Sequence, residues 1–85
     1  MPDNAALDRY HEELFLKGNY PSPFYGVYYK ETGNRDNKAT AGSTYYGPMQ
    51  IGPAAAQEYG IDRRDPYKNI EGGLRMLQNL YDKYG

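Results

Sequence analysis

Glu31 is the residue whose type and position in this chain best fit acid–base chemistry. It ends an apolar segment that begins with Pro23, and a loop rich in Gly, Asn and Thr follows at once. This order places one carboxyl at the lip of a cleft with apolar side chains behind it. Because burial disfavours the charged form, we expect a raised carboxyl pKa, which suits a general acid near neutral pH.

Other catalytic centres find less support in the sequence. His11 is the only histidine and has no Asp or His partner at ligand spacing, so we expect it on the surface of a helix. Neither Ser22 nor Ser43 has the surroundings of a catalytic nucleophile, and Ser22 fits a helix cap better. The chain also has no cysteine, which excludes disulfides and thiolate metal sites. We expect neither a metal nor a cofactor.

The chain holds eleven tyrosines, two phenylalanines and no tryptophan. A tyrosine ring can pack on the apolar face of a sugar while its hydroxyl bonds the polar rim, but it can equally replace Phe in a small core. The doublets Tyr28-Tyr29 and Tyr45-Tyr46 flank Glu31 and Gln50 in sequence. Their position favours the sugar-binding interpretation for these residues.

Length and charge limit the classes of function. The 85 residues make one domain, residues 1–85, with a small core. The formal net charge is −1 and no basic stripe is present, which argues against a nucleic-acid partner. No apolar run approaches the roughly 20 residues of a membrane span, and no signal peptide is visible. For work outside the cytoplasm we therefore expect a removed export signal or a carrier such as a phage particle.

Helical periodicity with start and stop signals predicts four helices. Each begins with a capping residue, a proline or both, and they start near residues 4, 23, 53 and 66. Residues 32–46 show no periodicity and are expected to form a loop, with at most a small β-hairpin near 40–44. The fold class is therefore mainly α, or α+β with a minor β element.

Three glycines, Gly26, Gly72 and Gly73, stand inside these helices. Glycine in a helix interior costs up to about 1 kcal/mol relative to alanine. We therefore expect close packing at each position, by a neighbouring backbone at Gly26 and by another helix at Gly72 and Gly73.

The order of motifs is similar to that of the goose-type lysozyme and bacterial lytic transglycosylase (SLT-type) superfamily. Its pattern is a helix ending in Glu-Ser-Gly, a loop, Gly-Leu-Met-Gln-Ile, a Pro-initiated Ala helix, then Asp-Pro and Asn-Ile-x-x-Gly. The corresponding stretches here are Glu31-Thr32-Gly33, Gly47 to Ile51, the Ala run after Pro53, and Asp65 to Gly73. The resemblance covers about residues 21–85.

The sequence departs from this pattern in three places. Thr32 replaces the serine and keeps its hydroxyl, while Pro48 and Met76 replace the usual Leu and Tyr. The sequence also ends at Tyr84-Gly85, before the Ala-Tyr-Asn-Ala-Gly motif that supplies a cleft tyrosine in typical members. We therefore expect a groove that is open on one side.

The resemblance implies a small lysozyme-like domain of about four helices around a cleft, which cleaves the β-1,4 MurNAc-GlcNAc bond of peptidoglycan. It implies Glu31 as the catalytic acid and base. The sugar contacts that it implies, together with the tyrosine doublets, are Thr32, Tyr28, Tyr29, Tyr46, Met49 and Gln50. Gly33, Gly47 and Asn69 are implied as structural residues near the site.

Glycoside cleavage also needs stabilisation of an oxocarbenium-like centre, usually by a second carboxylate. Asp36 lies in the polar loop and is interpreted as solvated. The other acids are expected on helix surfaces: Glu12, Glu13, Glu58, Glu71 and Asp82. An enzyme resembling this superfamily would therefore use one acid and the substrate's own 2-acetamido group.

Two interpretations stay open. The chain is either a peptidoglycan-cleaving enzyme, with water or the sugar's C6 hydroxyl as acceptor, or a non-catalytic module of the same fold that binds glycan or a protein partner. Glu31 and Gln50 favour the enzyme, and the short length favours the module. The implied setting is the periplasm and cell wall or a virion, with secretion-system, envelope or virion partners.

Overall fold

The structure is a computed structural model that describes residues 3–31 and 44–84, except for the side chain of Glu31. Four helices make up most of the described chain, which confirms the mainly α class. Their bounds are α1 Asn4–Lys17, α2 Pro23–Glu31, α3 Pro53–Tyr59 and α4 Pro66–Tyr84. The predicted hairpin near 40–44 lies almost wholly outside the described residues.

The helix boundaries follow the capping signals in the sequence. The Asp3 carboxylate accepts a hydrogen bond from the Ala6 N–H at 2.8 Å at the start of α1. Asp65 does the same for α4, where one carboxylate oxygen accepts from the N–H groups of Tyr67 and Lys68 at 2.9 and 3.2 Å. These bonds satisfy amide donors that have no partner within a helix.

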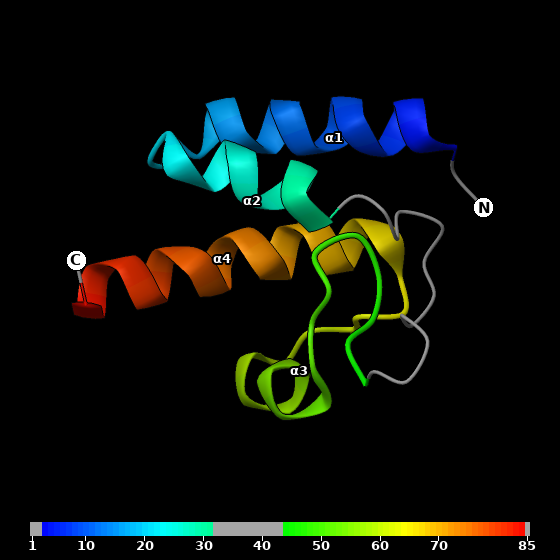
Figure 1. Ribbon diagram of the computed structural model, residues 1–85, viewed down its shortest axis with the longest axis vertical. Coiled ribbons are helices and arrows are strands. Elements are labelled where there is room, and N and C mark those ends of the chain that lie inside the picture. The colour runs from blue at the N-terminus through cyan, green and yellow to red at the C-terminus, as the bar shows by residue number, and fades with distance from the viewer. Residues whose placement is uncertain (1–2, 32–43, 85) are drawn as a thin grey trace.

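Figure 1 shows α1 and α2 stacked on one side of the long helix α4, with α3 on the other side. Between α2 and α3 the chain passes close to the first half of α4, where it forms a tight turn. One cluster of buried residues joins all these parts except α3, which contributes half-buried side chains. The cluster comprises Leu7, Phe24, Tyr28, Met49, Ile51, Ile61, Ile70 and Leu74. Burying one such aliphatic side chain contributes roughly 1.5–3 kcal/mol.

Two of the three helix glycines are indeed closely packed, but against side chains from loops. A β-carbon at Gly72 would lie 2.5 Å from Ile61 Cγ1, and one at Gly73 would lie 2.6 Å from Met49 Cγ. The expectation of a helix–helix contact there is therefore wrong. The expectation for Gly26 is also wrong, because a β-carbon at Gly26 would meet open space.

The prediction for His11 is wrong as well. Its side chain has no exposed surface, although Glu12 and Glu13 beside it are exposed. The reason is tertiary, since the aromatic residues of α2 cover this face of α1. The Tyr28 ring stacks on the His11 ring at a centroid distance of 4.0 Å.

Candidate functional site

The segment from Tyr46 to Ile51 forms a closed turn. Tyr46 and Ile51 exchange two backbone hydrogen bonds of 3.1 and 3.0 Å, as an isolated antiparallel bridge. Inside it, the Gln50 N–H donates to the Gly47 carbonyl at 3.0 Å. Pro48, at the second position of that inner turn, has the backbone angle that such turns favour. Local sequence and hydrogen bonding thus define the conformation of this motif.

Asn69 fixes this turn to α4. Its side chain is fully buried; Oδ1 accepts from the Met49 N–H at 2.8 Å, and Nδ2 donates to the Tyr46 carbonyl at 2.9 Å. Nδ2 also donates to the Arg63 carbonyl at 2.9 Å. One amide side chain therefore joins the turn, α4 and the segment before α4. The sequence predicted a structural Asn69 that ties this helix to the loop after Glu31; the partners that the structure describes are instead the backbones of Tyr46, Met49 and Arg63.

Arg63 also holds the two ends of this turn through hydrogen bonds, a role that the sequence did not predict. Its Nη1 donates to the Thr44 carbonyl at 2.5 Å and to the Ile51 carbonyl at 2.9 Å. The guanidinium groups of Arg63 and Arg64 lie 5.8 and 5.1 Å from the centre of the Tyr46 ring. Two adjacent arginines therefore lie beside Tyr46, a candidate sugar contact.

Two of the expected sugar contacts use their polar groups within the protein. The Gln50 side chain donates from Nε2 to the Gly47 carbonyl at 2.8 Å, and its backbone is left-handed with φ of 49°. Met49 is 7% exposed, and its N–H is bonded to Asn69. In this arrangement both residues shape the turn, and the Met49 N–H is not free for a ligand.

The tyrosines on α2 divide into a core residue and a surface residue. Tyr28 has no exposed surface, and its hydroxyl donates to Asp8 at 2.7 Å. A sugar cannot reach the Tyr28 ring in this conformation. Tyr29 is 39% exposed, and the nearby Tyr25 hydroxyl, together with burial, raises its pKa to about 12. Tyr29 is therefore the member of this doublet that a ligand can touch.

Glu31 is the last residue of α2, as the sequence predicted. Phe24 and Tyr28, which precede it at helical spacing, are both buried, so the helix face that leads to Glu31 is a core face. The same buried cluster contains Met49 and Ile51 from the turn. Thr32 and Gly33, the other expected residues of this motif, lie outside the described residues.

Glu71 is not the ordinary surface acid that the sequence suggested. It is half-buried and accepts a 2.5 Å hydrogen bond from the Tyr10 hydroxyl of α1. Burial, together with the Glu71 carboxylate, raises the pKa of Tyr10 to about 12. Lys68 lies 4.0 Å from the other carboxylate oxygen. This group ties α1 to α4.

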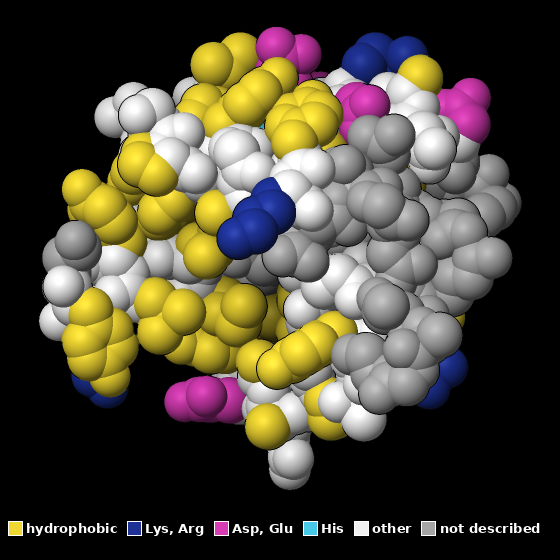
Figure 2. Space-filling model, in the orientation of Figure 1, with side chains coloured by type: hydrophobic (Ala, Val, Ile, Leu, Met, Phe, Trp, Pro, Cys, Tyr) yellow, Lys and Arg dark blue, Asp and Glu magenta, His cyan; other side chains and the backbone are white. Residues whose placement is uncertain are grey.

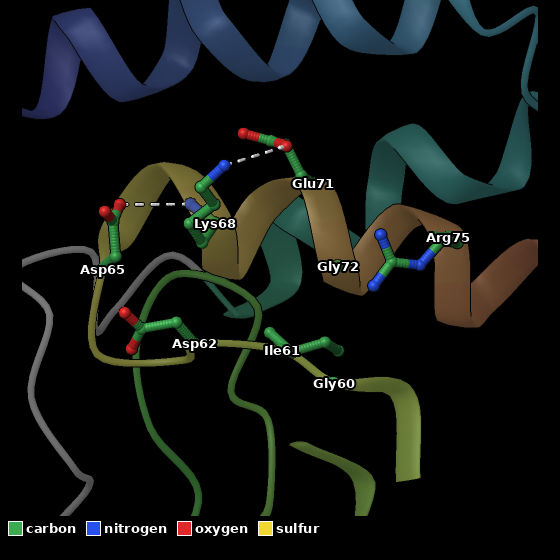
Figure 3. A pocket seen from close by; sticks show the side chains of 8 residues that line it. All are labelled: Gly60, Ile61, Asp62, Asp65, Lys68, Glu71, Gly72 and Arg75. Atoms are coloured by element: carbon green, nitrogen blue, oxygen red, sulfur yellow. Dashed lines mark hydrogen bonds and ion pairs between the residues drawn. The ribbon is translucent and has the colours of Figure 1, made fainter. Parts of the chain in front are cut away.

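A polar hollow of about 340 Å³ lies beside this group, between α4 and the segment that leads into it. Figure 3 shows the side chains that line it. Most of its charged side chains already have partners in the fold: Glu71 bonds Tyr10, Asp65 caps α4, and Arg75 donates to the Tyr59 carbonyl at 3.0 Å. The hollow contains none of the described residues that the sequence marked as sugar contacts.

Three further observations complete the description. Figure 2 shows hydrophobic side chains gathered where α1 and α2 meet the C-terminal half of α4. Over residues 3–31 and 44–84, no helix combines the length and apolar character needed to cross a membrane. In the same ranges, no group of three or more His, Asp or Glu side chains is arranged to hold a metal ion.

A comparison of the chain with known families agrees with the helical fold. Residues 16–85 match the family described as Transglycosylase SLT domain. The chain therefore belongs to the SLT family of lytic transglycosylase-type domains that act on peptidoglycan. A comparison with solved structures finds no match.

Proposed function

We propose that this chain cleaves the β-1,4 bond between MurNAc and GlcNAc in peptidoglycan, with Glu31 as the general acid and base. Family membership over residues 16–85 is the observation that carries the proposal. The end of α2 at Glu31 and the fixed Tyr46–Ile51 turn support it, because both lie at the positions of the family's motifs.

In the proposed mechanism the Glu31 carboxyl donates its proton to the leaving glycosidic oxygen as the C1–O bond breaks. The carbonyl oxygen of the substrate's 2-acetamido group bonds to C1 and neutralises the developing positive charge. Glu31, now a carboxylate, then removes a proton from the acceptor hydroxyl, which attacks C1 and expels the acetamido oxygen. One acid is sufficient for this sequence of steps, because the substrate supplies the nucleophile.

The sugar contacts proposed here are Tyr29, Tyr46, Gln50 and Thr32. Tyr46 is half-buried and lies beside two arginines, which could pair with the carboxylates of a stem peptide or a lactyl group. For Gln50 to reach the sugar, its side chain must exchange its bond to Gly47 for one to the ligand. Tyr28 and the Met49 N–H are left out of this set because both are engaged within the fold.

The second candidate function is a non-catalytic module that binds glycan or a protein partner. The observation in its favour is that Gln50 and Met49 are bonded within the turn, as they would be if the motif were retained for its shape. The site of action proposed in either case is the cell wall and periplasm or a virion.

Mass spectrometry of purified peptidoglycan incubated with the protein separates these functions. A transglycosylase releases muropeptides with a 1,6-anhydro ring, formed when the C6 hydroxyl is the acceptor. A lysozyme releases reducing ends, because water is the acceptor. Binding to peptidoglycan without released muropeptides would favour the module.

A further inference from the structure

His11 is a titratable side chain that the proposed glycosidase chemistry does not use. It is fully buried, and within the part of the chain that the structure describes neither Nδ1 nor Nε2 has a hydrogen-bond partner. A buried polar group without a hydrogen-bond partner destabilises the folded state. An apolar side chain of similar size would avoid that cost, so the histidine is unfavourable as a simple packing residue.

The surroundings of His11 are aromatic, and most of them come from the other helix. Tyr28 of α2 stacks on the ring with an interplanar angle of 11°. Tyr25 and Tyr29, also on α2, have centroid distances of 5.5 and 5.9 Å, and Phe15 of α1 lies at 6.2 Å. We call these four residues the aromatic box. His11 is therefore an α1 side chain that packs among the aromatic rings of α2.

Among the residues that the structure describes, the charges around the box do not compensate for a proton on His11. From α1, the Asp8 carboxylate favours the charged ring, but it already accepts the Tyr28 hydroxyl proton. From α2, the titratable groups are the hydroxyls of Tyr25, Tyr28 and Tyr29, which are uncharged at neutral and acid pH. Burial outweighs the effect of Asp8 and lowers the pKa of His11 to about 4.

We propose that His11 is an acid-sensitive latch: the neutral ring holds α1 against α2, and its protonation in mild acid releases the two helices from each other. A released ring is solvated and binds a proton near pH 6.5, whereas the packed ring does not. The contact is therefore fully stable above pH 6.5 and weakens as the pH falls toward 4.

Release would act on the end of α2 that carries Glu31 and on Tyr28, which belongs to the central core. Low pH would thus destabilise the packing of the helix end that carries Glu31, the proposed catalytic residue. This consequence for activity rests on the proposed function, whereas the latch itself does not.

Amide hydrogen exchange measured by NMR at pH 7 and pH 4.5, corrected for the intrinsic effect of pH on exchange, tests the latch. In the wild type, protection of α1 and α2 amides should be lower at pH 4.5 than at pH 7 by a factor on the order of 50. The reason is that at pH 4.5 a proton binds the released ring much more tightly than the packed ring. In the His11→Phe variant, protection of the same amides should differ by no more than a few-fold between the two pH values. Tyr25→Phe, which alters the box but leaves His11, should respond like the wild type.

An equal loss of protection in His11→Phe would overturn the proposal, and so would a loss shared equally by α4, which indicates global unfolding. The His11 ring protons of the wild-type protein give a measurement that needs no variant. Their NMR titration should have a midpoint well below 6.5, and a midpoint at 6.5 would also overturn the latch. Neither experiment measures glycan cleavage, so failure of the proposed function would leave their results unaffected.

Discussion

Asn69 and Gly47 are fitted to each other: a β-carbon added at Gly47 would overlap the amide of the Asn69 side chain. Gly47 also has φ of 81°, a conformation that side-chain-bearing residues rarely adopt. Asn69 reaches past this glycine to bond Tyr46 and Met49 on either side of it. The turn can approach α4 because one residue lacks a side chain and the other supplies both a donor and an acceptor.

Asn69→Ala should lower the free energy of unfolding by about 2–4 kcal/mol, because it leaves the buried Met49 N–H and the Arg63 carbonyl without these partners and removes one of the two bonds to the Tyr46 carbonyl. Urea unfolding followed by circular dichroism measures the change. Asn79→Ala, at an exposed position of the same helix, is the control and should change stability little. Equal effects of the two substitutions would contradict the role assigned to Asn69.

Gly47→Ala and Gly26→Ala should change stability in opposite directions. The first places a side chain at positive φ and against Asn69, so it should destabilise the fold by more than about 1 kcal/mol. The second meets open space inside a helix and should stabilise it by up to about 1 kcal/mol. Thermal unfolding of the two variants provides the comparison. A stabilised Gly47→Ala protein would contradict the close packing described for the turn.

The helices could be predicted from the sequence because their signals are local. Asp3 and Asp65 cap the amides next to them, and proline opens each of the helices that begin at 23, 53 and 66. The burial of His11 could not be predicted, because it depends on tyrosines that α2 brings from elsewhere in the chain. Glu71 was misjudged for the same reason, since its partner Tyr10 is 61 residues away.

The site itself could be predicted only in part. The sequence identified Asn69 as structural, and the order of motifs indicated the family that the comparison then showed. The role of Arg63 was not predicted, because its acceptors are backbone carbonyls, which every residue has and which no sequence pattern marks. The engagement of Gln50 within its own turn also required coordinates, since a glutamine can bond to backbone or to ligand equally well.

Tyr10 should titrate late in alkaline solution. Its folded-state pKa of about 12 lies above the ordinary value of 10, so the neutral hydroxyl is favoured in the fold. The stability contributed by Tyr10 should be fully present below pH 10 and lost as the pH rises through about 12. NMR of the Tyr10 ring carbon bonded to oxygen follows the titration, with Tyr10→Phe identifying the signal. A midpoint near 10 would contradict the bond to Glu71.

Short chitooligosaccharides should perturb the backbone NMR signals of Glu31, Thr32 and residues 45–51, because these residues flank the proposed site. The shifts of Tyr29 and Tyr46 ring protons should move with them. Tyr46→Ala should weaken binding by removing a stacking surface, whereas Tyr84→Ala, at the exposed end of α4, should not. Shifts confined to α1, or none at millimolar sugar, would contradict this location of the sugar site.

Glycan cleavage by Glu31→Gln is the most direct test of the proposed function. The amide keeps the shape of the side chain but cannot donate the proton, so the rate of muropeptide release should fall by a factor of about 10²–10⁴. Glu58→Gln, which changes an exposed acid on α3 in the same way, should retain the parent rate. Circular dichroism should show that both variants are folded. A Glu31→Gln protein that releases muropeptides within a few-fold of the parent rate would contradict Glu31 as the catalytic acid.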